Sequence, residues 1–303
     1  MKDRFFTLLK VIIAVGLIVW LVAKGNLSLK DMSHLFSPLA FLFFMGLAVI
    51  NLLITAWRWH VLLKAKGFSL SFKDVFPLQL IGVFFSFALP AGSVGGDLVK
   101  GYYVIKGEDQ RKLDAGMTVL MDRIVGLYAM VFLGLFFMTL KVSVFWNSPA
   151  LFSLYMMTAA AFGGLTLVLL LAFSHKAFSL FNKILVHMPL GDKVLKVYEG
   201  MKSYRNHKLA LIKAFSLSLL AQAVGVLFFM VAGSFLKVSG VPWTTYFFVV
   251  PIGMLITAIP LSQGGVGVGQ VAMMYLFGVF TGIKDLVVGQ VGITMFQLTL
   301  FLW

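Results

Sequence analysis

The sequence predicts an all-α polytopic membrane protein with about six full transmembrane helices and two oppositely oriented re-entrant hairpins. Of its 303 residues, 60% are hydrophobic and only 12% are charged, against about 25% charged in ordinary soluble domains. Six apolar runs are close to the roughly 20 residues that cross a bilayer as a helix or exceed them, and two further runs are broken by proline and glycine. So few charged residues cannot cover the core of a soluble globular protein, which excludes that class. So apolar a chain also does not stay disordered, which excludes a disordered protein.

The six uninterrupted runs are expected to form full spans within one integral membrane domain, residues 1–303. The first run, Phe5–Ala23, follows two basic residues. A secretory signal has a shorter apolar region and a small-residue cleavage site, so we expect this run to remain as a helix. The other five runs lie at residues 38–63, 113–140, 149–173, 209–233 and 286–303.

Two regions, Phe72–Gly107 and Tyr246–Gly282, are too long for one span and are interrupted halfway. Proline removes a backbone donor and glycine weakens a helix. Non-helical backbone at membrane depth is tolerated only inside protein or beside water. Each region is therefore predicted to form two half-helices that meet at a broken tip; two kinked or short spans are the alternative. Such interrupted segments in two halves of a chain indicate a transporter binding site. The interrupting prolines are Pro77, Pro90, Pro251 and Pro260.

The distribution of the 25 Lys and Arg residues predicts the orientation. With a cytoplasmic N-terminus, and with both hairpins returning to the side from which they start, 17 face the cytoplasm, 5 face outside and 3 lie within helices. Basic residues favour the cytoplasmic side, so we expect a multi-pass protein of the cell (plasma or inner) membrane. Residues 174–208 carry seven of these basic residues between apolar ones. They are expected to form a cytoplasmic amphipathic connection on anionic lipid, with a solvated loop as the alternative.

The net charge of +14 and the absence of cysteine narrow the partners and the chemistry. On so apolar a chain, a basic excess indicates anionic lipid headgroups rather than nucleic acid. Without cysteine there is no disulfide, thiolate metal site or cysteine nucleophile. The histidines do not group into a metal site. We therefore expect no metal and no cofactor.

The first broken region carries a glycine-rich, charged stretch at residues 89–102. Glycine lets the backbone approach a ligand closely, and a half-helix that begins near Gly95 would present free N–H groups to an anion. Asp97 suits a helix N-terminus electrostatically, and Lys100 adds a positive charge suited to a phosphate. The alternative is a tight turn capped by Asp97, with Lys100 at the cytoplasmic surface. The candidate binding residues are Gly95, Gly96, Asp97 and Lys100.

Asp122 and Arg123 are further candidates because they lie about nine residues into an apolar helix, where charges are costly unless paired or beside a wet cavity. Neighbours in sequence point in different directions, so each is expected to bond to another element. A purely structural ion pair, with Arg58 or Asp97 as partner, is the alternative. Arg58 itself ends a helix beside two tryptophans, either as a phosphate ligand or as an interface anchor.

The tip of the second broken region, residues 260–270, carries no charge. Its backbone and Gln263, Gly264 and Gly265 can bind polar groups without a full counter-charge. Its glycine pattern lacks the surrounding strand–turn–helix unit of a dinucleotide site. We expect the two tips to meet near the midplane and hold a lipid headgroup, with Asp97 and Asp122 orienting the basic residues.

Taken together, these motifs resemble the lysylphosphatidylglycerol synthase transmembrane-region family, a flippase-like domain family. The resemblance runs through nearly the whole chain. The family has Arg where this chain has Lys100. It commonly has an acidic residue where this chain has Gln270, so the resemblance does not imply a carboxylate-dependent step, such as proton coupling, at that position. The matching stretches are Arg58-Trp59 with Leu62-Leu63 and Gly67, then Leu89 to Lys100, Asp122 to Leu127, and Pro260 to Gln270.

The resemblance implies transbilayer movement of an anionic phospholipid, glycolipid or polyprenyl-phosphate lipid. Full-length synthases carry a soluble aminoacyl-transfer domain after the membrane region, and we expect this chain to be a stand-alone member without it, and not an enzyme. Two other classes stay open: an ion-coupled symporter of a small polar solute, and an enzyme or accessory subunit of polyprenyl-phosphate or glycolipid synthesis. The expected partner is a membrane lipid with an anionic headgroup; a second copy of the chain and a lipid-synthesis enzyme are further candidates.

Overall fold

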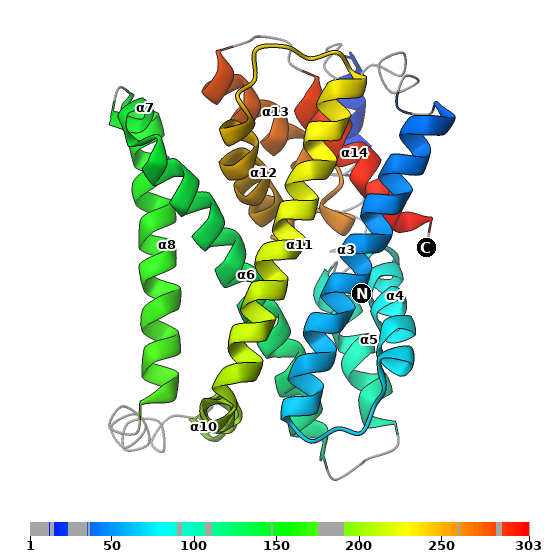
Figure 1. The fold of residues 1–303 in the computed structure, drawn as a ribbon, viewed down its shortest axis with the longest axis vertical. Coiled ribbons are helices and arrows are strands. Elements are labelled where there is room, and N and C mark those ends of the chain that lie inside the picture. Colours follow the sequence, from blue (N-terminus) through cyan, green and yellow to red (C-terminus); the bar gives the residue numbers. More distant parts are fainter. Residues whose placement is uncertain are drawn as a thin grey trace.

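The computed structural model describes residues 12, 15–23, 35, 37–89, 93–106, 111–146, 148–174, 191–259, 261–282 and 287–302, and within these ranges every regular element is a helix (Figure 1). In this described part of the chain, four helices are long and apolar enough to cross a membrane. They have 25 to 29 residues each, or about 38–44 Å at 1.5 Å per residue, which exceeds the hydrocarbon thickness of about 30 Å. These helices are α3 (Pro38–Ala65), α6 (Lys112–Leu140), α8 (Pro149–Phe173) and α11 (Lys208–Phe235).

The ends of these helices follow from local sequence. Pro38 and Pro149 stand in the first turns of α3 and α8, where a missing N–H costs nothing. Ser37 caps α3 by accepting a hydrogen bond from the backbone N–H of Ala40 at 3.3 Å. At its other end, α3 stops before Gly67, whose φ of +74° suits a residue without a side chain.

Each of the two interrupted regions forms two helices separated by a break, as the sequence predicts. The first comprises α4 (Phe72–Ala88) and α5 (Ser93–Ile105), which pack against each other in the lower half of Figure 1. The second comprises α12 (Trp243–Thr257) and α13 (Val268–Thr281), which pack together in the upper half.

Two of the four predicted proline interruptions do not break a helix. Pro77 and Pro251 lie inside α4 and α12, and both helices continue through them. Proline is tolerated within membrane helices where neighbouring groups satisfy the carbonyl that it leaves free. Pro90 and Pro260, at the two breaks, lie outside the described residues.

The first and last apolar runs are both predicted to form full spans, and the structure describes them to different extents. Residues 15–23 of the first apolar run are helical, and the rest of that run lies mostly outside the described residues. The last run forms α14 (Val288–Phe301), whose 14 residues extend about 21 Å, less than a straight crossing needs. The remaining elements are α7 (Val142–Trp146), α10 (Gly191–Lys202) and the 3-10 helices η2 (Ser203–His207) and η3 (Gln263–Gly265).

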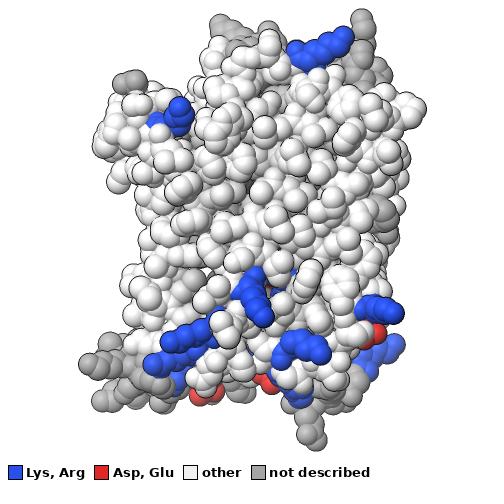
Figure 2. Space-filling view, in the orientation of Figure 1, with Lys and Arg blue, Asp and Glu red and all other residues white. Residues whose placement is uncertain are grey.

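The main hydrophobic core lies in the upper half of the molecule, where α11, α12, α13 and α14 pack together (Figure 1). Phe228 and Phe229 on α11 and Phe277 on α13 are almost fully buried there. On the face shown in Figure 2, most Lys and Arg side chains gather over the lower end and few over the upper end. The broad middle is uncharged on this face, as lipid contact requires.

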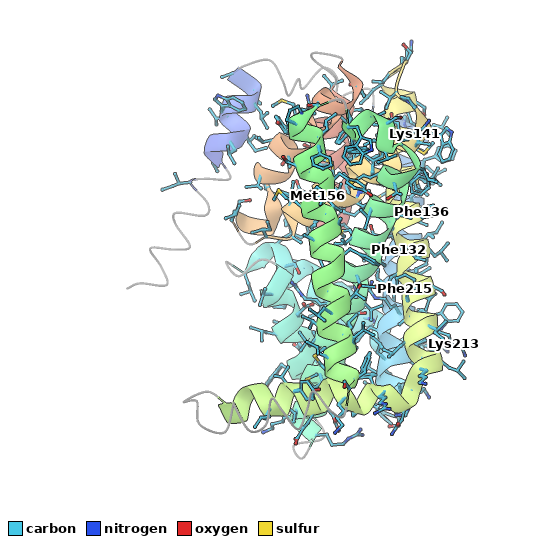
Figure 3. The ribbon with its side chains drawn as sticks, turned by 90° about the vertical axis from the view of Figure 1, so that its left-hand side faces the viewer. Phe132, Phe136, Lys141, Met156, Lys213 and Phe215 are labelled. Atoms are coloured by element: carbon cyan, nitrogen blue, oxygen red, sulfur yellow. The ribbon has the colours of Figure 1, made fainter. Side chains whose placement is uncertain are left out.

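The predicted cytoplasmic connection, residues 174–208, is described only in part. Residues 175–190 lie outside the described residues, and α10 follows them. In Figure 3, α10 lies across the lower end of α8 rather than parallel to it. Met201 and Tyr204, at its end and in the following η2, are buried.

Candidate functional site

The candidate site is built around an ion pair between two long helices. Arg58 on α3 donates from Nε to Oδ1 of Asp122 on α6 at 2.6 Å, and from Nη2 to Oδ2 at 3.0 Å. Its Nη1 donates to Oγ of Ser218 on α11 at 3.2 Å. Arg58 is 9% exposed and Asp122 is 5% exposed. The planar guanidinium therefore meets both carboxylate oxygens and joins three helices.

A second ion pair lies next to the first. Nε of Arg123 on α6 donates to Oδ2 of Asp97 on α5. Asp122 and Arg123 are thus bonded to different elements, as expected for neighbours on a helix. The Arg123 side chain is 36% exposed and the Asp97 side chain 21%, so this pair lies nearer the surface than the first.

Lys100 on α5 lies between the two pairs. Its Nζ is 3.7 Å from Oδ2 of Asp122 and 4.0 Å from Oδ1 of Asp97. Both distances exceed those of an ordinary hydrogen bond. The ammonium also lies 4.3 Å from the ring centroid of Trp59, in cation–π contact. Trp59 is held in place because its Nε1 donates to Oγ1 of Thr118 at 3.2 Å. Lys100 is only 4% exposed, so it is not a surface lysine.

Three glycines make room for these side chains. A Cβ on Gly82 of α4 would clash with the aliphatic stem of Lys100, and one on Gly126 would lie 2.9 Å from Nη1 of Arg58. A Cβ on Gly96 would clash with the Gly82 carbonyl oxygen and with Oγ of Ser86. Small residues therefore let α4 approach α5, and α6 approach the Arg58 side chain of α3, closely enough to enclose the cations.

We call Arg58, Asp97, Lys100, Asp122 and Arg123 the charged cluster. Its three cations and two carboxylates leave one positive charge in excess. Arg58 lies seven residues before Ala65, the last residue of α3, so the charged cluster is about 10 Å inside that end. Charges at such a depth are costly and commonly mark a substrate or ion pathway. The charged cluster is thus suited to an anion that brings the missing negative charge.

The second break is polar but uncharged. Gly264, Gly265 and Gly267 have φ angles of +59°, +72° and +82°, which L side chains rarely adopt. Gln270 holds this turn, because its Oε1 accepts from the Gly267 backbone N–H at 2.8 Å. Its Nε2 donates to Oε1 of Gln297 on α14 at 2.8 Å, and Nε2 of Gln297 donates to the Gly264 carbonyl at 3.2 Å.

The two halves of the molecule meet between the charged cluster and this turn. A Cβ on Gly264 would lie only 2.5 Å from Cδ1 of Phe87, near the end of α4. A cavity of about 280 Å³ lies beside this contact, lined by residues of α4, α6, α12 and α14 and by the second break. Most of the lining is apolar, and its polar side chains are Ser86, Thr257, Ser262 and Gln297.

The structure brings together five of the ten predicted site residues, which form the charged cluster. Gly95 and Gly96 lie within α5 and not in a tip loop, and α4 fills the space beside Gly96. Gly264 and Gly265 line the cavity. Gln263 belongs to η3, and its side chain lies outside the described residues.

Sequence reasoning missed several residues that shape the site. Ser218 is a serine in an apolar run, and only its contact with Arg58 distinguishes it. Gly82 carries no local signal, since its role is the space that it leaves for Lys100. Trp59 was noted only as a neighbour of Arg58, yet it is fully buried and its ring contacts the Lys100 ammonium. Gln297 belongs to no motif, and the presence of an amide within an apolar run is the one signal that the sequence offers.

The comparisons with known proteins agree with the resemblance in the sequence. The family model described as "Lysylphosphatidylglycerol synthase TM region" matches residues 7–302. A curated protein, the "UPF0104 membrane protein MJ1595" of Methanocaldococcus jannaschii, is 32% identical over 90 residues. That match covers 30% of this chain and 27% of the archaeal protein. No solved structure matches the chain significantly. With a family match over almost its full length, and with four helices able to span a bilayer, this multi-pass membrane protein belongs to the lysylphosphatidylglycerol synthase transmembrane-region family.

Proposed function

We propose that this protein moves a lipid with an anionic or phosphate headgroup from one leaflet to the other, and that it does so as a translocator and not as an enzyme. The observation that carries the proposal is the charged cluster, with three cations and two carboxylates enclosed among apolar helices. An isolated excess charge in such surroundings is unfavourable, and an anionic ligand relieves it.

Lys100 is the cation that binds the headgroup first in this proposal. Arg58 already has both oxygens of Asp122 and the hydroxyl of Ser218 as partners. The Lys100 ammonium instead lies beyond hydrogen-bond distance from both neighbouring carboxylates. It can therefore donate to a phosphate without breaking a short ion pair. The Arg123 side chain is about one-third exposed, so in this proposal it contacts the same headgroup from the more exposed side of the charged cluster.

The two helix pairs supply the route. We propose that α4–α5 enters the membrane from the cytoplasm and α12–α13 from the outside, each as a re-entrant hairpin. The contact between Gly264 and Phe87 supports tips that meet within the protein. The gathering of basic side chains at the lower end of the face in Figure 2 supports a cytoplasmic assignment of that end, and with it a cytoplasmic N-terminus in the cell membrane.

The family match supports the proposal at the level of a membrane domain. The archaeal relative is named only as a membrane protein, and its match spans 27% of its own length. The identity of the lipid therefore has to come from experiment.

The test uses purified protein in vesicles that contain traces of fluorescent phosphatidylglycerol or phosphatidylcholine. Chemical quenching of the outer leaflet measures the rate of movement. We expect the anionic lipid to move faster than the zwitterionic one. Lys100→Gln should slow the anionic lipid by about 10- to 100-fold, since a hydrogen bond to a charged group contributes about 1.5–3 kcal/mol. Lys100→Arg should retain movement because it keeps the charge.

Lys213→Gln is the matched control, because Lys213 is exposed on α11 and projects away from the bundle in Figure 3. It should behave as the parent protein does. Rates equal to those of protein-free vesicles would contradict the proposal. A Lys100→Gln variant as fast as the parent would remove Lys100 from the route. Turnover of a lipid phosphate by the protein alone, or uptake of a soluble solute, would favour the enzyme or symporter class instead.

A further inference from the structure

The residues that line the cavity between the two halves include a serine whose hydroxyl is buried. Ser262, in the second break, is 2% exposed, and its Oγ makes no hydrogen bond within the part of the chain that the structure describes. The other hydroxyls of the lining, those of Ser86 and Thr257, donate to carbonyl oxygens one turn earlier in their own helices. A buried hydroxyl without a partner is unfavourable, so its presence beside a cavity indicates a ligand that accepts its hydrogen bond.

The cavity suits an uncharged and mostly apolar group. Among the described residues that line it, no side chain is charged. Its volume of about 280 Å³ is many times the roughly 30 Å³ share of one water molecule, so it holds a group of several non-hydrogen atoms. A whole lipid does not fit into this space. The glycerol of a diacyl lipid, together with its two ester groups, has this size and is apolar apart from its carbonyl oxygens.

The position of the cavity relative to the charged cluster supports the same occupant. Gly82 faces the stem of Lys100, and Ser86 lines the cavity one helical turn further along α4. That separation is about 6 Å along the helix axis. In a glycerophospholipid, a few bonds separate the phosphate from the ester carbonyls. A single lipid can therefore reach Lys100 with its phosphate and the cavity with its esters.

We propose that this cavity is a second, uncharged subsite that binds the ester-linked glycerol of the translocated lipid, with the Ser262 hydroxyl donating to an ester carbonyl. The inference rests on the proposed function, and it adds a recognition step that the charged cluster cannot perform. A polyprenyl-phosphate carries the phosphate but no ester carbonyl, and it leaves Ser262 without a partner. The subsite therefore discriminates between lipids that share one headgroup.

The test measures binding to the purified protein in detergent rather than transport. The probes are two phosphatidylglycerols with equal chain lengths, one with ester linkages and one with ether linkages. We expect the parent protein to bind the ester lipid about two- to tenfold more tightly, the typical effect of one net hydrogen bond. Ser262→Ala should lower the affinity for the ester lipid to that for the ether lipid and leave the latter unchanged. Lys100→Gln should weaken both equally.

Two further measurements keep the result interpretable. Thr299→Val removes another buried hydroxyl, on α14 and outside the cavity lining, and should leave the ester preference intact. Without lipid, Ser262→Ala should melt at the same temperature as the parent protein or above it, because the hydroxyl has no partner to lose among the described residues.

Equal affinity of the parent for both lipids, or an equal loss for both in Ser262→Ala, would overturn the subsite. An ester preference in binding together with no movement in vesicles would support the subsite and contradict the proposed function.

Discussion

Arg58 and Asp122 stand 64 positions apart in the sequence, and their side chains form a two-point ion pair inside the helical bundle. The pair joins α3 to α6 at the depth where Lys100 of α5 approaches the same carboxylate. Ser218 of α11 completes the coordination of the guanidinium. The three helices that carry the charged cluster, α3, α5 and α6, are thus linked to one another and to α11 through one carboxylate and one guanidinium.

The first prediction concerns the stability that this pair provides. Asp122→Asn should lower the free energy of unfolding by about 3–5 kcal/mol, because it leaves buried cations without their counter-charge. Denaturant unfolding in detergent measures this loss. The double variant Arg58→Met with Asp122→Leu should recover most of it, since apolar replacement of a buried pair is often neutral. The same double variant should lose the preference for anionic lipid. An Asp122→Asn protein as stable as the parent would show that the pair is not required for folding.

The second prediction separates the charge of Arg123 from its geometry. Arg123→Lys keeps the positive charge but loses the planar fork that contacts Asp97. The variant should melt within a few degrees of the parent, because the side chain is partly exposed, yet it should move lipid slowly in the vesicle assay. A normal rate would identify the Arg123–Asp97 pair as structural scaffolding only.

The third prediction addresses the space in which Lys100 lies. Gly82→Ala places a methyl group where the Lys100 stem now packs, so the ammonium must shift away from Trp59. Overpacking of this kind costs about 1–3 kcal/mol. We expect a less stable protein with a reduced preference for phosphatidylglycerol over phosphatidylcholine. The control is Gly46→Ala on α3, where a Cβ meets nothing within 4 Å. Unchanged lipid preference in Gly82→Ala would show that Lys100 does not need this space.

The fourth prediction tests the orientation of the first helix pair. The parent chain has no cysteine, so single cysteines report accessibility directly. Ser71→Cys and Lys106→Cys flank α4 and α5, and both should react with a membrane-impermeant reagent from the cytoplasm. Lys141→Cys and Lys237→Cys should react from the outside; in Figure 3, Lys141 lies at the end of the molecule opposite to α10. All four positions are exposed, so a missing reaction is not explained by burial. Reaction of positions 71 and 106 from opposite sides would exclude the first re-entrant hairpin.

Local sequence determined the helices of this protein. The uninterrupted apolar runs predicted α3, α6, α8 and α11 to within a few residues, because the length of such a run is a local feature of the sequence. The two glycine- and proline-rich breaks were predicted for the same reason. Pro77 and Pro251 were exceptions, since a proline inside a helix is tolerated or not according to what packs beside it.

The tertiary structure decided which charges meet and which spaces stay open. The sequence showed that Asp122 and Arg123 need partners in other elements, and it named Arg58 and Asp97 as candidates. Only the rotation and crossing of the helices assigned Asp122 to Arg58 and Arg123 to Asp97. The burial of Lys100 depends on the missing side chain of Gly82 in another helix. The Ser262 hydroxyl, which has no partner among the described residues, lies by a cavity that four helices and the second break leave open. Such features result from contacts between segments that are distant in the chain, and no local pattern encodes them.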